Sequence, residues 1–363
     1  MARKYVLVIN PGSTSTKVAI YEGKNEIKSN KIVHNSKELE KYKKVSEQYD
    51  YRLKLIYDWL KKEEVLTSSL IAVVGRGGLL KPIPGGTYIV TEKMIEDLEN
   101  SIQWEHASNL GGILAKGIGD KEGIKSYILD PVAVDEFEDI ARISGLKDIE
   151  RKSLIHALNI KAVSYRRANE LNENIEELNF IVAHLGGGIS IAPVKGGKMI
   201  DVNNAIEMGP FSPDRTGGLP VGDVVRLCYS GKYTYDEMLL KIKGKGGLAG
   251  YLGTMDGREI EKMIEKGDKK AELIYKAMAY QIGKEIGAMS TVLCGDIDSI
   301  ILTGGLAYSE YLVDIIEEMI GFISNVIVYP GEDEMKALND GVLRVLNGEE
   351  KEKIYEDEVI LRC

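Results

Sequence analysis

The sequence contains few cysteines and few histidines, and this scarcity excludes several kinds of site. Its three cysteines, Cys228, Cys294 and Cys363, are widely spaced and odd in number, so they form neither a disulfide framework nor a metal site. We interpret them as two core thiols and a stray C-terminal thiol in a reducing compartment. Only four histidines occur in 363 residues, and none has the H-E-x-x-H spacing of a zinc-binding helix.

Long apolar segments are also missing. No run approaches the roughly 20 apolar residues that a membrane-spanning helix needs. The first residues carry positive charge, but the apolar stretch behind them is short and ends in a turn, unlike a secretory signal. We therefore expect a soluble cytoplasmic protein that does not bind membranes.

Basic residues are fewer than acidic residues, and the formal net charge is −9. A protein that binds nucleic acid broadly needs a basic surface, so no nucleic-acid partner is expected, although a few focused cations can still bind phosphate. The length and the apolar fraction of 44% are sufficient for two domains. The 39 glycines cluster in several loops, which is typical of backbone that approaches a ligand closely.

The segment Tyr5–Tyr21 predicts two strands joined by a polar turn. An apolar run stops at Asn10, passes four hydroxyl residues that include Ser13 and Ser15, and resumes after Lys17. Hydroxyls, backbone N–H groups and an ammonium suit the terminal phosphates of a nucleotide. The segment is not a Walker A loop, because that motif leads into a helix. An ordinary solvated hairpin with a surface lysine is the alternative.

A second segment, Phe180–Val194, repeats this pattern of strand, small-residue turn and strand. A third strand is expected after each copy, near Glu26–His34 and Lys198–Asn203. The repetition predicts a duplicated domain, with a small-molecule site between the two copies.

The order of the expected elements, a β-hairpin followed by alternating helices and strands, predicts an α/β fold in which helices cover both faces of mixed sheets. We place the first domain at residues 1–150 and the second at 151–346, with 347–363 completing the first. A long helix capped by Ser36 is expected over Ser36–Glu63. The other helices are expected near Glu92–Ile102, Glu105–Ile118, Val134–Ile143, Ser153–Leu171, Val221–Ser230, Tyr235–Lys241, Asp268–Leu293, Ser309–Ile320 and Asp333–Leu346.

Two arginines are candidates for phosphoryl chemistry. Arg76 ends the expected strand Ile71–Gly75, and Arg215 lies in a loop rich in proline and glycine. A guanidinium binds phosphate or carboxylate bidentately, so two such groups can clamp a phosphoryl group during its transfer. A surface arginine in a turn is the alternative for each. Asp130, at the end of another expected strand, is a candidate Mg²⁺ ligand.

Four motifs in this order resemble the acetokinase family, and most closely its butyrate and branched-chain fatty acid kinases. They are Asn10–Lys17, His184–Gly188, Asp214–Pro220 and Thr303–Ala307. One departure is Gly187, which stands where the family usually has asparagine. The resemblance implies the duplicated two-domain fold shared by actin, sugar kinases and Hsp70 (the ASKHA fold), with sheets like those of ribonuclease H.

The resemblance also implies roles for individual residues. The catalytic residues would be Arg76, Asp130, His156 and Arg215. The nucleotide-binding residues would be Asn10, Ser13, Ser15, Lys17, His184, Gly186, Gly187, Gly188, Asp256, Arg258, Gly304 and Gly305. The acid would lie near Gly78, His106 and Ile155. The metal ligands would be Asp130 and the acidic residues Asp333 and Glu334.

The activity implied is the reversible, Mg²⁺-dependent transfer of a phosphoryl group from ATP to a short-chain carboxylic acid, which yields ADP and an acyl phosphate. Butyrate or a branched analogue is the expected acid, because Gly78 and Ile155 stand where the acetate enzymes carry bulkier residues. A homo-oligomer is expected. The alternatives are an acetate or propionate kinase, a sugar kinase of the same fold, and a nucleotide-gated protein without turnover.

Overall fold

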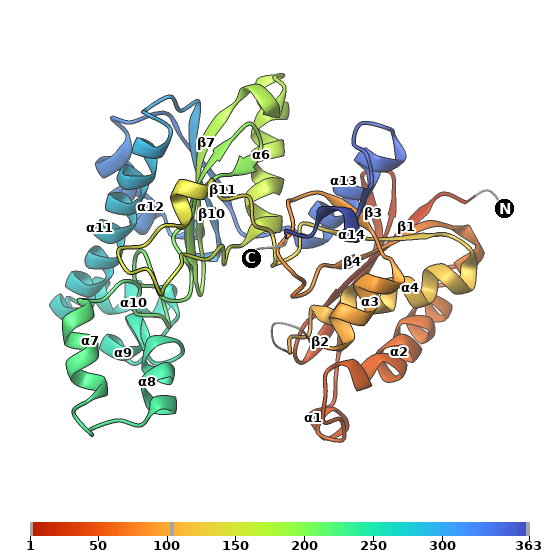
Figure 1. The fold of residues 1–363 in the computed structure, drawn as a ribbon, viewed down its shortest axis with the longest axis horizontal. Coiled ribbons are helices and arrows are strands. Elements are labelled where there is room, and N and C mark those ends of the chain that lie inside the picture. The colour runs from red at the N-terminus through yellow and green to blue at the C-terminus, as the bar shows by residue number, and fades with distance from the viewer. Residues whose placement is uncertain (1–2, 102–104, 361–363) are drawn as a thin grey trace. The chain divides into compact units, whose positions relative to one another are not determined.

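The computed structural model describes residues 3–101 and 105–360, and the chain folds into two units (Figure 1). Unit 1 comprises Met1–Asp135 together with Asp333–Cys363, and unit 2 comprises Glu136–Glu332. The predicted boundaries, after residues 150 and 346, differ from this division. The chain leaves the first unit earlier and returns to it earlier than the sequence pattern indicates.

Tertiary contacts explain the early return. Helix α13 (Glu334–Leu346) belongs to unit 1, where it packs on β1 (Tyr5–Pro11) and β4 (Leu70–Arg76). The Asn339 side chain donates a hydrogen bond of 2.9 Å to the carbonyl of Gly23. These partners are distant in sequence, so local patterns do not show them.

The early departure has a similar cause. The Glu136 carboxylate accepts hydrogen bonds from Lys161 Nζ at 2.8 Å and from the Met199 N–H at 2.9 Å. Both partners belong to unit 2. An ion pair and a backbone bond thus tie residue 136 to the second unit.

Unit 1 contains a seven-stranded sheet of order β12-β5-β6-β4-β1-β2-β3. β1, β4 and β6 are parallel, while β2 and β3 continue from β1 as an antiparallel meander. One face packs on α2, α3 and α4 through a large apolar cluster, and α13 covers the other face (Figure 1). Besides β1 and β4, the strands are β2 (Ser15–Glu22), β3 (Asn25–Val33), β5 (Thr87–Ile89), β6 (Lys125–Leu129) and β12 (Lys353–Ile354); the helices besides α13 are α1 (Ser36–Leu39), α2 (Tyr49–Lys62), α3 (Glu92–Glu99), α4 (Asn109–Glu122) and α14 (Tyr355–Glu358).

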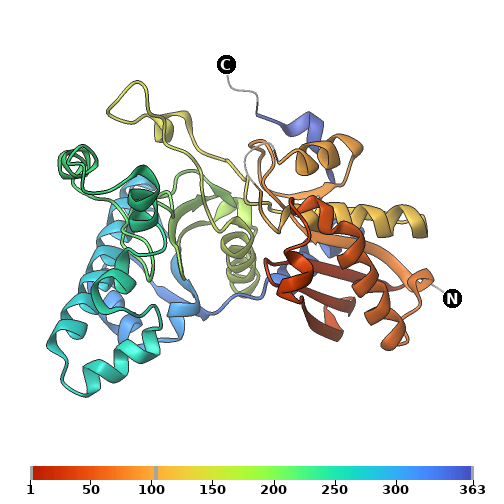
Figure 2. The ribbon, with the colours of Figure 1, turned by 90° about the horizontal axis from the view of Figure 1, so that it is seen from below.

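Unit 2 contains a five-stranded sheet of order β11-β10-β7-β8-β9. β7, β8 and β9 form an antiparallel meander, and β7, β10 and β11 are parallel, so the motif at the start of unit 1 recurs. Helices α11 and α12 pack on one face and α6 on the other, where Figure 2 shows it end-on. The strands are β7 (Asn179–Leu185), β8 (Ile189–Lys195), β9 (Lys198–Met199), β10 (Ser299–Gly304) and β11 (Val326–Pro330); the helices are α5 (Asp139–Arg142), α6 (Ala157–Leu171), α7 (Val221–Cys228), α8 (Tyr235–Ile242), α9 (Gly247–Leu252), α10 (Gly257–Glu265), α11 (Lys269–Val292) and α12 (Glu310–Ile320).

The prediction of one continuous helix over Ser36–Glu63 is wrong. The chain forms the short α1, a 3-10 turn at Ser46–Gln48 and then α2. Asn35 caps α1 in place of Ser36. The Glu47 carboxylate accepts from the N–H groups of Lys43 and Lys44, and such local side-chain bonds stabilise a turn at the expense of a helix.

The helix predicted over Val134–Ile143 is also wrong over most of its length, because only α5 is helical. Val134 instead forms a β-bridge with Ile83.

The interpretation of Cys228 and Cys294 as core thiols is wrong too, since both are exposed; Cys363 lies outside the described residues. Over residues 3–101 and 105–360, no helix is long and apolar enough to cross a membrane.

Candidate functional site

The turn between β1 and β2 presents the predicted phosphate-binding residues on its exposed side. Ser13 is exposed and lies in the turn itself, while Ser15 and Lys17 alternate with the buried Thr16 at the start of β2. This alternation follows from the two-residue repeat of a strand. Within the part of the chain that the structure describes, the Lys17 ammonium has no hydrogen-bond or ion-pair partner, so it is available to an anion.

Asn10, Arg76 and Glu334 form a connected polar group in unit 1. The Asn10 amide donates to Glu334 Oε2 at 2.6 Å, and Arg76 NH1 lies 2.5 Å from Glu334 Oε1. Glu334 begins α13, whereas Asp333 caps that helix by accepting from the N–H of Lys336. Of Asp333 and Glu334, both predicted to serve the metal, it is Glu334 that contacts Asn10 and Arg76 among the described residues.

Asp130 lies at the end of β6 with a strained backbone. Its φ of 36° is unusual for a residue other than glycine, and such strain is often found at functional positions. The buried carboxylate accepts from the Gly86 N–H at 2.7 Å. His106 Nδ1 lies 2.7 Å from the hydroxyl of Ser108, the residue that precedes α4, and 3.2 Å from its N–H.

The structure corrects the reason given for Gly78. A Cβ atom there would lie 2.6 Å from Asn109 Cα and 2.9 Å from Leu98 Cδ2. The missing side chain thus lets this loop pack on α3 and α4, and it opens no space for an acyl chain. Ile155, which is also expected near the acid, is 5% exposed in unit 2.

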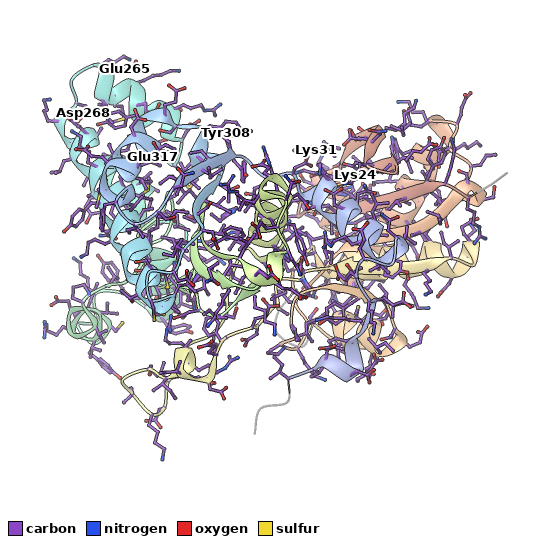
Figure 3. All side chains as sticks on the ribbon, turned by 90° about the horizontal axis from the view of Figure 1, so that it is seen from above. Lys24, Lys31, Glu265, Asp268, Tyr308 and Glu317 are labelled. Atoms are coloured by element: carbon purple, nitrogen blue, oxygen red, sulfur yellow. The ribbon has the colours of Figure 1, made fainter. Side chains whose placement is uncertain are left out.

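A pocket of about 710 Å³ lies within unit 2 and brings together segments that are far apart in sequence. Its lining includes Gly186, Gly187, Asp256, Arg258 and Gly305, all predicted to bind the nucleotide. Tyr308, labelled in Figure 3, is 70% exposed at the pocket and offers an aromatic surface. The sequence analysis missed Tyr308, although it follows directly on the Thr303–Ala307 motif.

Asp256 and Arg258 pair with each other at this pocket. The Arg258 guanidinium donates to both oxygens of Asp256, at 3.0 and 2.6 Å, and these bonds lower the pKa of Asp256 to about 2. Asp256 also caps α10. The carboxylate is therefore ionised at neutral pH and holds the start of α10 at the pocket wall.

Arg215 also lines the pocket and is packed against glycine. A Cβ atom on Gly188 would lie 2.0 Å from Arg215 NH1, so glycine at this position makes room for the guanidinium. NH1 donates to the carbonyl of Ala205 at 2.7 Å. The buried Nε lies 3.6 Å from Asp214 Oδ1, and neither atom has a hydrogen-bond partner in the described residues. Burial lowers the pKa of Arg215, and a buried donor without an acceptor, such as its Nε, is unusual in a folded protein.

His156 and His184 stack with their ring centroids 3.9 Å apart. His156 Nδ1 lies 2.9 Å from Ser190 Oγ, and His184 Nδ1 lies 2.8 Å from the Asn159 amide. Asn159 was not predicted; it follows His156 by three residues, the spacing that places two side chains on one face of a helix. The two imidazoles thus hold each other in fixed orientations.

The described residues contain no ready-made metal cage, since nowhere do three His, Cys, Asp or Glu side chains group together. Mg²⁺ usually takes one or two protein carboxylates together with phosphate oxygens and water. Glu334 and Asp130 are the candidate carboxylates in unit 1.

Comparison with known proteins identifies the family. The model of the acetokinase family matches residues 147–341. The chain is 59% identical to probable butyrate kinase 2 of Caldanaerobacter subterraneus subsp. tengcongensis over 96% of this chain and 99% of that protein. It is 53% identical to butyrate kinase 1 of Clostridium acetobutylicum, with the same coverage. The chain belongs to the acetokinase family.

A solved structure of a family member supports the fold. Acetate kinase of Porphyromonas gingivalis superposes with a TM-score of 0.79 at 21% identity, over 94% of this chain and 100% of that one. The predicted α/β fold class is confirmed by this match and by the two mixed sheets. At this identity the likeness concerns the fold alone.

Proposed function

We propose that this member of the acetokinase family transfers the terminal phosphoryl group of ATP to butyrate or a branched analogue, giving ADP and an acyl phosphate. The acceptor is a carboxyl group and the reaction is reversible. The full-length relatives that carry the name butyrate kinase support this acid. The observation that carries the proposal is the pocket of unit 2, which gathers five predicted nucleotide residues beside Arg215.

In this proposal the chemistry is direct in-line transfer. Arg76 and Arg215 neutralise oxygens of the carboxylate and of the transferring phosphoryl group, which carry the charge in such a transition state. A carboxylate acceptor needs no general base, since it is already ionised at neutral pH. His156 donates a hydrogen bond, held in place by its stacking on His184.

We propose that Mg²⁺ is held through Glu334 and Asp130, and it would neutralise phosphate charge when bound. The turn from Ser13 to Lys17 holds the terminal phosphates. The pocket lined by Asp256, Arg258 and Gly305 holds the adenosine.

The experiment that tests the function is a hydroxamate assay for acyl phosphate, with ATP, Mg²⁺ and a series of acids from acetate to hexanoate, branched acids included. Each methylene that fits an apolar pocket changes kcat/KM by about 10- to 200-fold, so we expect butyrate and its branched analogues to exceed acetate clearly. Product from acetate alone would indicate an acetate kinase. Turnover of sugars without any hydroxamate would indicate a sugar kinase.

We also propose a homo-oligomer. Helix α7 exposes Val221, Val225 and Tyr229 along one stripe, at 75%, 50% and 89% exposure, and apolar stripes of this kind often mark contacts between subunits. Sedimentation velocity of the full chain measures the state directly.

A further inference from the structure

Arg52 is a buried cation directly behind the proposed phosphate-binding turn. It lies in α2 and is only 1% exposed, although arginine is almost never fully buried without a partner. Its position on an amphipathic helix gives no indication of this burial. The sequence analysis therefore did not select it.

The guanidinium of Arg52 binds the turn through several hydrogen bonds. NH1 donates to the carbonyls of Gly12 and Ser15, at 2.9 and 3.3 Å, and to the Thr16 hydroxyl at 3.0 Å. NH2 donates to the carbonyl of Ser13 at 3.4 Å. The guanidinium thus donates hydrogen bonds to three carbonyls of one turn.

These bonds determine where the N–H groups of the turn are directed. In a trans peptide the C=O and the following N–H have opposite directions, and the described residues contain no cis bond. Because the carbonyls of Gly12 and Ser13 are directed at Arg52, the N–H groups of Ser13 and Thr14 are directed away from it. Neither N–H has an acceptor among the residues described, and both residues are exposed. Successive open N–H groups of this kind form an anion-binding concavity.

The charge on Arg52 is not balanced by an ion pair in the described part of the chain. No carboxylate in residues 3–101 and 105–360 forms an ion pair with it, and Gln48, which accepts from Nε and NH2 at 3.0 and 2.8 Å, is neutral. Burial lowers the pKa of Arg52 to about 10, so it remains protonated at neutral pH. A buried cation of this kind favours an anion on the open side of the turn.

We propose that Arg52 is a positioning residue for the terminal phosphates of the nucleotide. It holds the turn so that the N–H groups of Ser13 and Thr14 meet the phosphate oxygens, and it supplies a fixed positive charge behind them. The inference rests on the proposed function, in which this turn holds the phosphates.

The test compares the affinities of ATP, ADP and AMP for Arg52→Lys and Arg52→Gln by titration calorimetry. A hydrogen bond to a charged group is worth about 10- to 100-fold in affinity, so we expect ATP to bind at least about tenfold more weakly while AMP is unchanged. Ile56→Ala is the matched control. It lies one turn further along α2 and is fully buried in the apolar cluster, where its side chain can make no hydrogen bond to the turn. It should therefore lower stability without changing the ratio of ATP to AMP affinity.

A second variant keeps the test decisive if both Arg52 variants fail to fold. Gln48→Ala retains the arginine and removes the acceptor that anchors it, so it should shift the same ratio in the same direction. Equal weakening of ATP and AMP, or an unchanged ratio in the folded variants, overturns the inference. Lys17→Met separates the two proposals. If Lys17→Met also leaves the ratio of ATP to AMP affinity unchanged, the phosphate-binding role of the turn fails. If Lys17→Met lowers this ratio and the Arg52 variants do not, only the role of Arg52 fails.

Discussion

At the scale of single residues, the site depends on charged groups that the fold takes out of water. The Arg215 side chain is only 18% exposed, and Arg76 pairs with the Glu334 carboxylate in the described part of the chain. A preorganised donor of this kind acts on charge that develops in the transition state. Its removal affects the rate more than the stability.

We therefore predict that Arg76→Ala and Arg215→Ala each lower kcat by about 10²- to 10³-fold. The melting temperature should change little. Arg→Lys at either position should restore little activity, since the bidentate fork is lost. The measurement is steady-state kinetics with the hydroxamate assay. The matched control is Arg226→Ala, an exposed arginine paired with Asp223 on α7, and near-normal activity in either site variant contradicts its assignment.

His34 provides a second prediction, on pH. Its Nε2 lies 2.8 Å from the Thr16 hydroxyl, and burial, with a smaller contribution from Arg52, lowers its pKa to about 4. The unfolded chain, with a pKa near 6.5, binds the proton more readily. Stability is therefore complete above pH 6.5 and falls as the pH drops towards 4, by roughly 3 kcal/mol for this group.

Urea unfolding at pH 7, 6, 5 and 4 measures this dependence. His34→Gln keeps a hydrogen-bonding side chain for Thr16 but does not titrate, so its unfolding free energy should fall less over this range. Parallel pH profiles for the two proteins would show that His34 makes no such contribution.

At the scale of elements, the turn between β7 and β8 shows why adjacent glycines are not equivalent. A Cβ on Gly188 would collide with Arg215, whereas a Cβ on Gly187 has no neighbour within 4 Å. Gly304 is constrained differently, because its φ of 89° and the nearby carbonyl of Leu185 both require glycine. Gly188 is thus required for packing, and Gly304 is required for its backbone conformation as well.

We predict that Gly188→Ala displaces the Arg215 guanidinium and lowers kcat by about 10²-fold or more, as the loss of one oriented donor does. Gly145→Ala is the matched control, because a Cβ on this exposed glycine has no neighbour within 4 Å, and it should keep kcat within a few-fold, on the order of the effect of an exposed surface change. Circular dichroism checks that both proteins are folded. Equal activities of the two variants would contradict the packing argument.

At the scale of the whole molecule, the residues predicted to hold the nucleotide are divided between the two units. Asn10, Ser13, Ser15 and Lys17 belong to unit 1, while the lining of the 710 Å³ pocket belongs to unit 2. We predict that saturating Mg²⁺-nucleotide lowers the radius of gyration in small-angle scattering, as in hinge closure around a ligand. AMP, which lacks the terminal phosphates, is the control and should have a smaller effect. An unchanged profile with Mg²⁺-ATP contradicts closure.

The fold class, the repeated hairpin and the main motifs could be predicted from the sequence. Buried and exposed residues alternate at Ser15, Thr16 and Lys17. This alternation is a local property of a strand, so it can be predicted without a structure. The long helix α11 and the short buried strands β4 and β6 were likewise predicted from local sequence patterns. The family could be recognised because its motifs are short and contiguous.

Other features became visible only when the elements had packed together. They are the unit boundaries, the neighbours of Gly78, the different contacts of Asp333 and Glu334, and the burial of Arg52. Each depends on residues far apart in sequence: α13 packs on β1, Asn109 fills the space beside Gly78, and the guanidinium of Arg52 reaches a turn 40 residues earlier. Local propensity contains no information on such contacts, because hydrophobic burial and long-range hydrogen bonds are fixed only when the elements pack together.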